Sequence, residues 1–503
     1  MKPDYDEIRH LARTGAYRRI PVYRELLSDR FTPVEVMRTL RAASTHCYLL
    51  ESADSHQRWG RYTFLGYDPT VELTCTNGRL RLTGSAVNDL LGMKEGEFDV
   101  GHPGAMIQKI LKAYKSPGPK DSPALKELPP FTGGLVGYFS YEYIQYGEPA
   151  LKKLFDESGD FCDVDLMLFD KVLAFDHYRQ KIILIAGVNT AKLEESYKEA
   201  VAELDCMEKL LESGAKAYFK PLFMEGALTP VFSEEQFCSM VARAKRYIHE
   251  GDIFQVVLSD PMEAKASGSL FDAYRVLRTT NPSPYMFYFS SASIEIAGAS
   301  PETLVKLENG KLYTFPLAGT RPRGRDAAED ERLSRELLAD EKERAEHNML
   351  VDLGRNDLGK ISTLGSVAVE KYMEIQRFSH VMHIGTTVCG ALADGKSAVD
   401  AVDAILPAGT LSGAPKLRAC EIIRELEGRR RGVYGGAIGY LDFTGNLDTC
   451  IAIRLAYKKY GRVCVQSGAG IVADSIPQKE FEECKNKARA VINALTAAQG
   501  GIQ

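Results

Sequence analysis

The 503-residue sequence has no CxxC pair among its ten cysteines and no excess of basic side chains. Scattered cysteines without short framework spacings are typical of reduced thiols in a cytosol. The net charge of -5, from 63 basic and 68 acidic side chains, argues against binding to nucleic acid or to an anionic membrane surface. We therefore expect the partner to be a small molecule or another protein.

Long apolar runs are also missing. No stretch approaches the roughly 18 apolar residues that cross a bilayer. The first residues, MKPDYDEIRH, alternate in charge and lack the apolar segment of a secretion signal. We expect a cytoplasmic protein without membrane contact. Hydrophobic residues still make up 45% of the chain, which is enough for large cores in two or three domains.

The chain divides at residues 214–230, which contain glycine and proline without periodicity. We predict an N-terminal domain over 1–225 and a C-terminal domain over 226–503. Residues 171–188 have the composition of a β-hairpin, and residues 191–213 place apolar side chains at helical spacing. Strands in hairpins beside long separate helices predict an α+β fold with mainly antiparallel sheets.

A short pattern, GGxxGY, occurs at 133–138 and again at 435–440. Each copy opens a segment with β-like composition. Two related sheets, one in each half, would explain the repetition, but six residues can also match by chance in a glycine-rich chain.

Two acidic pairs have the spacing of one helix face. Glu343 and Glu346 are three residues apart, as are Glu480 and Glu483. Such a pair is usually a solvated helix surface. If both pairs converge, their repulsion, on the order of 1 kcal/mol per contact in water, requires a cation, and carboxylates with room for waters suit Mg²⁺. Lys487 follows Glu483 by one turn, so it either holds an anion or pairs with that glutamate.

Residues 316–324 read PLAGTRPRG, a turn without a nucleophile because Ala318 stands at its centre. Gly319 lets backbone N–H groups approach a ligand, and Arg321 and Arg323 suit a carboxylate or phosphate. A basic surface turn is the simpler alternative.

Three further features point to anion binding or acid–base chemistry. His383 is either an ordinary core histidine or a general base. Arg454 interrupts an apolar strand pattern, and a buried guanidinium there needs an anion, either a ligand carboxylate or a structural glutamate. Residues 466–470, QSGAG, form a glycine turn whose N–H groups can hold another oxygen. The combination indicates a divalent metal and several anion holders without a nucleophile.

Seven motifs in this order resemble the chorismate-utilising enzymes: PLAGTRPRG, KERAEHNMLVDLGRNDLG, HVMHIGTTVCG, LPAGTLSGAPK, GGAIGYLDF, QSGAGIVADS and EFEECKNKAR. LLES at 49–52 and NPSPYMFY at 281–288 extend the resemblance to nearly the full chain, and it is strongest to the branch formed by component I of the anthranilate synthases. The resemblance implies an α/β/α sandwich with mainly antiparallel sheets. It also implies conversion of chorismate and ammonia to anthranilate and pyruvate, the first committed step of tryptophan biosynthesis.

The resemblance assigns a role to each motif position. Glu346 and Glu483 would bind Mg²⁺ directly, while Glu343 and Glu480 would hold its waters. Glu302 resembles the acid that protonates the departing C4 hydroxyl, and His383 the residue that removes the C2 proton. The implied catalytic residues are Glu302, His383, Glu343 and Thr410, and the implied substrate-binding residues are Gly319, Thr320, Tyr434, Arg454, Gly468, Gly470 and Lys487.

The nucleophile follows from two absent lysines. Relatives that attack with an amine have lysine at the position of Ala318, and those that activate water have it at the position of Gln255. Ammonia from outside is therefore implied. Because no GxCxG segment of a glutaminase is present, the resemblance implies a separate glutamine amidotransferase subunit, in a heterotetramer of two large and two small subunits.

The resemblance further implies feedback inhibition by tryptophan in a pocket formed by Glu51, Ser52, Pro284, Tyr285 and Met286, for which ordinary packing at a domain contact is the alternative. Two other functions stay open. An aminodeoxyisochorismate synthase would stop at the aminated intermediate, and a binding protein would regulate without catalysis.

Overall fold

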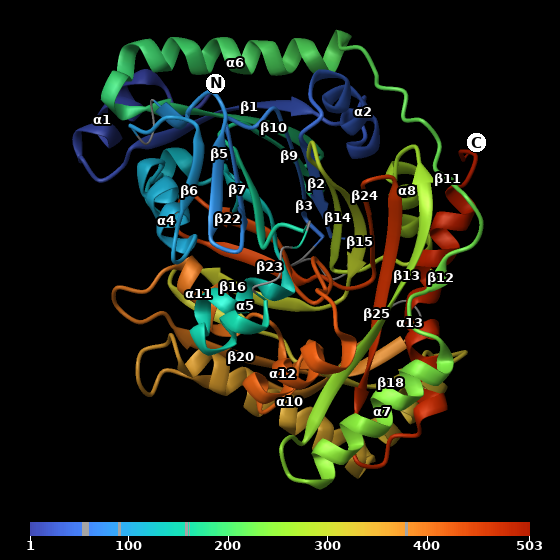
Figure 1. Ribbon diagram of the computed structural model, residues 1–503. Helices are drawn as coiled ribbons and strands as arrows, with labels where there is room; N and C mark the ends of the chain where they lie inside the picture. Colours follow the sequence, from blue (N-terminus) through green and yellow to red (C-terminus); the bar gives the residue numbers. More distant parts are fainter. Residues whose placement is uncertain (53–59, 89–91, 156–158, 160, 378–380, 503) are drawn as a thin grey trace.

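The computed structural model describes the chain except for residues 53–59, 89–91, 156–158, 160, 378–380 and 503. Two large antiparallel sheets lie at its centre, with helices on their outer faces (Figure 1). In the described residues no helix has the length and apolar content needed to span a membrane.

The first sheet has 13 strands. Its order is β1 (Arg19–Leu27), β10 (Lys181–Asn189), β9 (Val172–Asp176), β3 (Tyr62–Tyr67), β2 (Cys47–Glu51), β14 (Tyr285–Ser290), β15 (Glu295–Ser300), β24 (Leu455–Lys459), β25 (Arg462–Ile471), β13 (Gln255–Ser267) and β11 (Phe223–Met224), with β12 (Thr229–Pro230) and β21 (Gly413–Ala414) paired to β13. The expected hairpin is β9 and β10, which pair directly.

The second sheet has 12 strands. Its order is β18 (Leu317–Pro322), β20 (Val381–Ala391), β17 (Lys311–Thr314), β16 (Thr303–Glu308), β23 (Leu447–Ile451), β22 (Ala437–Asp442), β7 (Gly134–Phe139), β8 (Val164–Phe169), β4 (Val71–Thr76), β5 (Arg79–Thr83) and β6 (Gly96–Asp99), with β19 (Ala368–Arg377) paired to β20.

The helices cover the outer faces of both sheets. They are α1 (Tyr5–Arg13), α2 (Pro33–Ala43), α4 (Gly104–Ala113), α5 (Ile144–Gly147), α6 (Leu193–Ser213), α7 (Glu234–His249), α8 (Phe271–Thr280), α9 (Ala327–Ala339), α10 (Glu341–Gly359), α11 (Ala398–Ile405), α12 (Lys416–Glu427) and α13 (Pro477–Ala498). The largest buried cluster joins Tyr48 and Phe289 of the first sheet to Tyr138 and Phe169 of the second, so the sheets pack face to face. The α+β sandwich with mainly antiparallel sheets is confirmed.

The two GGxxGY segments are neighbours in one sheet, so the expectation of two separate sheets is wrong. Strands β7 and β22 pair antiparallel with Gly137 opposite Gly439. A Cβ atom on Gly137 would lie 2.0 Å from the Asp165 carbonyl oxygen, and one on Gly439 would lie 2.1 Å from that of Asp448. Only glycine allows the flanking strands to approach this closely.

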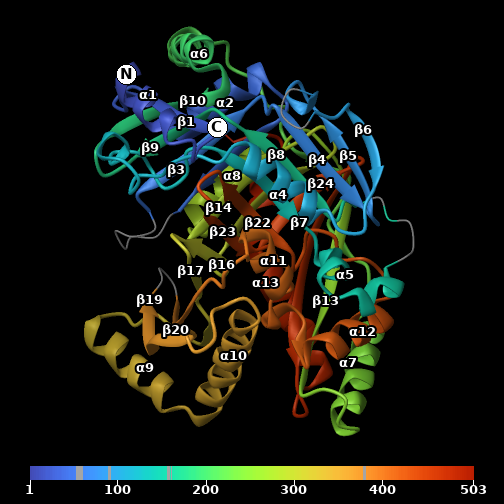
Figure 2. The same ribbon diagram turned by 90° about the vertical axis from the view of Figure 1, so that its left-hand side faces the viewer.

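Both sheets combine strands from the two halves of the chain. Strand β2 pairs with β14, and β7 pairs with β22. The division into 1–225 and 226–503 stays a prediction. At the lower end of Figures 1 and 2, α10 lies with β18 and β20, and Figure 2 shows α9 and β19 beside them. Helix α10 carries Glu343 and Glu346, two of the four glutamates predicted to bind a metal.

Asp165 on β8 gives the fold a predictable pH dependence. Its side chain is fully buried, and burial raises its pKa to about 8. The folded state therefore keeps a proton that the unfolded chain releases near pH 4, so this group's stabilisation is present at low pH and is lost as pH rises through about 8. We expect Asp165→Asn to flatten the fall in stability between pH 5 and 9, measured by urea unfolding. A slope equal to that of the wild type would contradict the assignment.

Candidate functional site

A hydrogen-bonded pair, Glu302 and Thr410, joins the start of β16 to a 3-10 turn, η5 (Gly409–Leu411). The Thr410 hydroxyl donates to Glu302 Oε1 at 3.2 Å, and the Ile451 N–H donates to the Glu302 carbonyl oxygen at 2.9 Å. Burial raises the pKa of Glu302 to about 7, while the Thr410 hydroxyl opposes that rise. A carboxyl group with a pKa near neutrality is suited to donate a proton.

His383 on β20 lies against residues 316–324, which contain strand β18 with a register shift between Ala318 and Arg321, and not the turn that the sequence predicted. Its Nδ1 is 2.8 Å from the Gly319 carbonyl oxygen and 3.2 Å from Thr320 Oγ1. Because a carbonyl oxygen only accepts, Nδ1 carries the proton of the neutral ring and Nε2 carries the lone pair. Burial lowers the pKa of His383 below its ordinary value. The imidazole is therefore neutral near pH 7 and is suited to accept a proton.

Arg454 acts on both groups. It lies between β23 and β24 with a left-handed φ of 51°. The sequence pattern predicted a position inside one strand, but Arg454 occupies the break between two strands. Its charge lowers the pKa values of Glu302 and His383. Within the described ranges its guanidinium forms no hydrogen bond or ion pair, and burial lowers its own pKa. Such a guanidinium is suited to a ligand carboxylate.

The predicted substrate-binding glycines lie on β25 beside polar side chains, so the prediction of a glycine turn at residues 466–470 is wrong: this segment pairs with β13 as a regular strand. A Cβ atom on Gly468 would lie 2.9 Å from the Tyr434 hydroxyl oxygen, and one on Gly470 would lie 2.9 Å from Gln255 Nε2. Lys487 Nζ donates to the Gly468 carbonyl oxygen at 3.1 Å. The structure thus brings a phenol, an amide and an ammonium group to two glycines that are two residues apart on β25.

The four predicted metal-binding glutamates lie on two helices, α10 and α13. Burial raises the pKa of Glu346, and the charges of Glu343 and Glu483 raise it further. Burial also raises the pKa of Glu480, and Glu483 adds to the rise. The carboxylates therefore repel one another across the two helices. Lys487 offsets part of this repulsion, because its Nζ lies 2.7 Å from Glu483 Oε1.

These carboxylates fit Mg²⁺ in donor type and charge but do not form a ready cage. In the part of the chain that the structure describes, no three His, Cys, Asp or Glu side chains are grouped closely enough to hold a metal ion. A set of mutually repelling oxygens is still the donor chemistry that Mg²⁺ accepts, since this ion keeps several waters.

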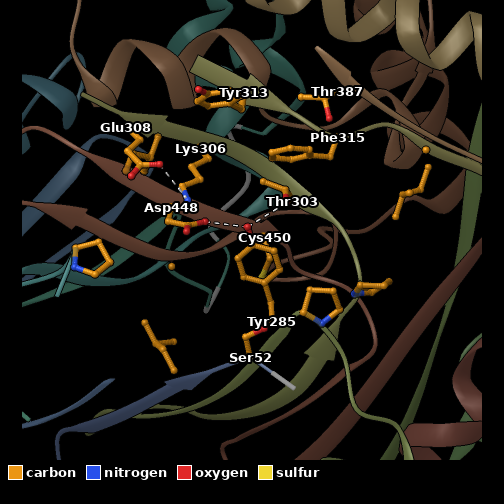
Figure 3. A pocket seen from close by; sticks show the side chains of 18 of the residues that line it. Ser52, Tyr285, Thr303, Lys306, Glu308, Tyr313, Phe315, Thr387, Asp448 and Cys450 are labelled. Atoms are coloured by element: carbon orange, nitrogen blue, oxygen red, sulfur yellow. Dashed lines mark hydrogen bonds and ion pairs between the residues drawn. The ribbon is translucent and has the colours of Figure 1, made fainter. Parts of the chain in front are cut away.

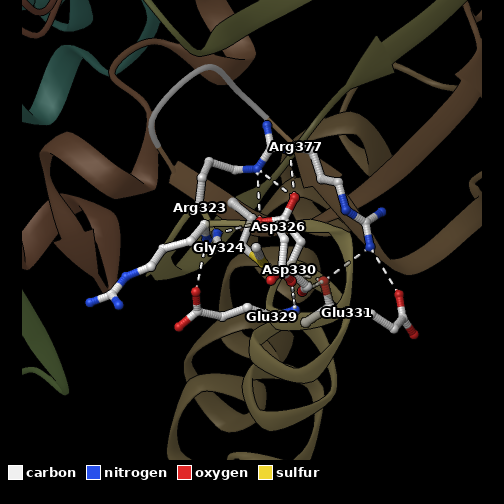
Figure 4. Close-up of polar contacts among 10 residues, drawn as sticks. Arg323, Gly324, Asp326, Glu329, Asp330, Glu331 and Arg377 are labelled. Carbon is white, nitrogen blue, oxygen red and sulfur yellow. Dashed lines mark hydrogen bonds and ion pairs between the residues drawn. The ribbon is translucent and has the colours of Figure 1, made fainter.

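Arg321 and Arg323 of the PLAGTRPRG segment form ion pairs with acidic residues at or near the start of the two following helices, so their charges already have partners within the protein. Arg321 lies 2.9 Å from Asp340 and 3.4 Å from Glu343. Arg323 donates to both carboxylate oxygens of Asp330 near the start of α9, as Figure 4 shows. The Arg321 pairs fix the segment to α10, which carries Glu343, and the Arg323 pair fixes it to α9. Their acidic partners were not predicted, although the acidic segment after the turn was a visible signal.

All five residues predicted to bind tryptophan line one pocket of about 1040 Å³. They are Glu51, Ser52, Pro284, Tyr285 and Met286. The pocket lies between β2 and β14 of the first sheet and β16, β22 and β23 of the second (Figure 3). Its position between two sheets explains why segments far apart in the sequence contribute to it.

Tyr285 connects this pocket to the strand that carries Glu302. Its hydroxyl donates to Asp448 at 2.8 Å and lies 2.9 Å from Thr303 Oγ1 (Figure 3). Thr303 directly follows Glu302, so a residue of the pocket wall is the chain neighbour of Glu302. Thr303 and Asp448 were missed because they meet Tyr285 only in the folded chain.

Comparison with known proteins agrees with this geometry. Residues 45–493 match the family model for the chorismate binding enzyme. Anthranilate synthase component 1 of Acetivibrio thermocellus is 44% identical over 99% of both chains, and that of Aquifex aeolicus is 42% identical over 98% of both. The structure of anthranilate synthase component I from Streptococcus pneumoniae matches with a TM-score of 0.72 and 35% identity, over 93% of this chain and 99% of that one.

Proposed function

The chain belongs to the family of chorismate binding enzymes, and from that premise we propose that it converts chorismate and ammonia to anthranilate and pyruvate. The observation that carries the proposal is that one site contains both an acid and a base, and that the charge of Arg454 acts on both. Glu302 is an acid with a pKa of about 7, and His383 is a neutral base. The reaction needs both, since one hydroxyl leaves and one ring proton is removed.

Glu302 would protonate the C4 hydroxyl as it departs. Hydroxide is a poor leaving group, and a carboxylic acid that retains its proton near pH 7 turns it into water. Thr410 orients the carboxyl group through its 3.2 Å hydrogen bond. Arg454 would hold a substrate carboxylate beside it.

His383 would act in the second half of the reaction, when pyruvate leaves and the ring becomes aromatic. The Gly319 carbonyl oxygen holds the proton on Nδ1, so Nε2 accepts the proton from C2. The positive charge of Arg454 lowers the pKa of His383 and keeps the ring neutral before this step.

Mg²⁺ would be held by Glu346 and Glu483 directly, with Glu343 and Glu480 holding its waters. When bound, it supplies positive charge that orients the ring carboxylate and stabilises negative charge formed in the reaction. Lys487 contributes a second positive charge at Glu483 and Gly468.

The site has no group that would replace ammonia as the nucleophile. Ala318 is a buried methyl group on β18, and Gln255 presents an amide beside Gly470. We propose that a glutamine amidotransferase subunit supplies the ammonia, in a heterotetramer of two large and two small chains. All ten cysteines are free thiols, which supports a location in the cytoplasm.

We also propose that tryptophan inhibits the enzyme from the pocket of about 1040 Å³. Its lining combines aromatic and apolar side chains such as Met286 and Phe287 with charged ones such as Glu51, and this combination suits the ring and the charged groups of an aromatic amino acid. Bound tryptophan would contact Tyr285, whose hydroxyl lies 2.9 Å from the Thr303 hydroxyl, beside Glu302. This contact gives the effector a direct route to the general acid.

Ser52→Phe is expected to relieve tryptophan inhibition at least roughly tenfold with little change in turnover, because the larger ring occupies the effector's space. The measurement is the tryptophan concentration for half-inhibition. Ser52→Ala keeps the space and is the control, with inhibition close to that of the wild type. Unchanged inhibition in Ser52→Phe would place the effector elsewhere.

The function itself is tested with His383→Gln. If His383 removes the C2 proton, this variant releases the aminated intermediate with little pyruvate, whereas the wild type forms anthranilate. Products are separated by chromatography after reaction with chorismate, Mg²⁺ and ammonium. Loss of anthranilate without accumulation of the aminated intermediate would contradict the assigned role, and an aminated product from the wild type would favour an aminodeoxyisochorismate synthase.

A further inference from the structure

A buried ion pair lies behind the substrate-binding residues. Glu427, the last residue of α12, and Arg431 are 4% and 2% exposed. Arg431 Nε donates to Glu427 Oε2 at 2.9 Å, and a terminal nitrogen donates to Oε1 at 2.5 Å. Apolar residues of the same volume are often as stable as a buried ion pair. The retained charges therefore call for a role beyond stability.

The remaining donors of Arg431 reach two backbone segments of the site. One terminal nitrogen donates to the Leu411 carbonyl oxygen at 2.7 Å, and the other donates to the Val257 carbonyl oxygen at 2.7 Å. Leu411 directly follows Thr410. Val257 on β13 lies opposite Gly470 on β25.

Glu427 also binds β13, at Ser259, two residues beyond Val257. Its Oε1 accepts the Ser259 N–H at 2.8 Å and the Ser259 hydroxyl at 2.9 Å. Ser259 lies opposite Gly468 in the ladder. The guanidinium also lies 5.9 Å from the centre of the Tyr434 ring. The ion pair thus contacts the backbone next to Thr410, the residues that lie opposite Gly468 and Gly470, and the ring of Tyr434.

We infer that Arg431 and Glu427 are positioning residues that hold η5, β13 and Tyr434 in the register that chorismate binding and protonation by Glu302 require. This inference rests on the proposed function. Neither residue has a role assigned above, and both act through backbone groups. The planar guanidinium donates in several fixed directions at once, which the single ammonium of lysine cannot reproduce.

The test is Arg431→Lys, with Arg430→Lys as the matched control. Arg430 is also nearly buried and pairs with Asp163, and it donates to Asn77 and to the Phe155 carbonyl oxygen, neither of which belongs to η5. We expect both variants to lose stability. Only Arg431→Lys should lower kcat about tenfold or more and raise the KM for chorismate.

The pH profile separates positioning from a general loss of structure. If η5 shifts, the Thr410 hydroxyl no longer lowers the pKa of Glu302, so the decline of kcat at high pH moves to higher pH. Arg454 and Lys487, the cations that face Glu302, are unchanged in both variants. Arg430→Lys should therefore keep the wild-type profile.

The inference is overturned if folded Arg431→Lys keeps the wild-type kcat, KM and pH profile, or if Arg430→Lys changes them equally. Should Arg431→Lys fail to fold, Glu427→Gln decides, because it keeps the shape and should still raise the KM and shift the profile. If the wild type makes no anthranilate, the proposed function fails. Chorismate affinity then decides the inference, and it should fall only in the Arg431 and Glu427 variants.

Discussion

Glu302→Gln is expected to lower turnover by roughly 10²-fold or more while chorismate still binds. The amide keeps the shape of the side chain and can still accept the hydrogen bond from Thr410, but it has no proton to give to the leaving hydroxyl. The measurement is kcat together with chorismate affinity. A loss confined to kcat identifies an interaction made in the transition state.

The pH dependence provides the second part of this prediction. Glu302 is active while protonated, so wild-type kcat should decline as pH rises through about 7. The concentration of NH₃ has to be held constant across the series. In Glu302→Gln this decline should disappear. Glu308→Gln, at the far end of β16, the strand that begins directly after Glu302, is the control and should keep both the rate and the profile. Unchanged turnover in Glu302→Gln would remove this residue from the mechanism.

Glu346→Gln is expected to abolish the activation by Mg²⁺, with a loss of roughly 10²-fold or more. The same substitution should raise the thermal stability of the metal-free protein. The reason is that Glu343 and Glu483 repel the Glu346 carboxylate. Burial is the main cause of the raised pKa of Glu346, and these two charges raise it further. Under the proposed function, a charge that opposes folding without the metal would be needed to hold Mg²⁺.

The two measurements are activity against Mg²⁺ concentration and the melting temperature in a chelator. Glu482→Gln is the control, because Glu482 lies next to Glu483 on α13 but pairs with Lys485 at 2.9 Å. It should leave the response to Mg²⁺ unchanged. If Glu346→Gln destabilises the metal-free protein and still responds to Mg²⁺, the four glutamates do not form one site.

The sequence predicted local features of the fold well and the pairing of distant strands poorly. The hairpin β9–β10 and the helix α6 follow from composition and periodicity, which are local. Two related sheets were one explanation for the repeated GGxxGY pattern, with a chance match as the other, yet the two segments lie in adjacent strands of one sheet. Strand pairing depends on contacts between residues far apart in the chain, and a short pattern does not encode its partner.

The site residues show the same difference between what local motifs predict and what contacts between distant segments decide. Glu302, His383 and Arg454 were identified from motifs, and the structure brings their charges together. Arg321 and Arg323 were expected to hold an anion because their type suits one, but the start of the next helices supplies their partners. The ion pair of Arg431 and Glu427 was not predicted, because its significance lies in the backbone groups that it reaches.

The most direct test of the central claim is a product analysis of the purified chain with chorismate, Mg²⁺ and ¹⁵N-labelled ammonium. We predict anthranilate that carries the label, together with an equal amount of pyruvate and no requirement for glutamine. Isochorismate as the product, or a labelled aminated intermediate without pyruvate, would contradict the proposed reaction.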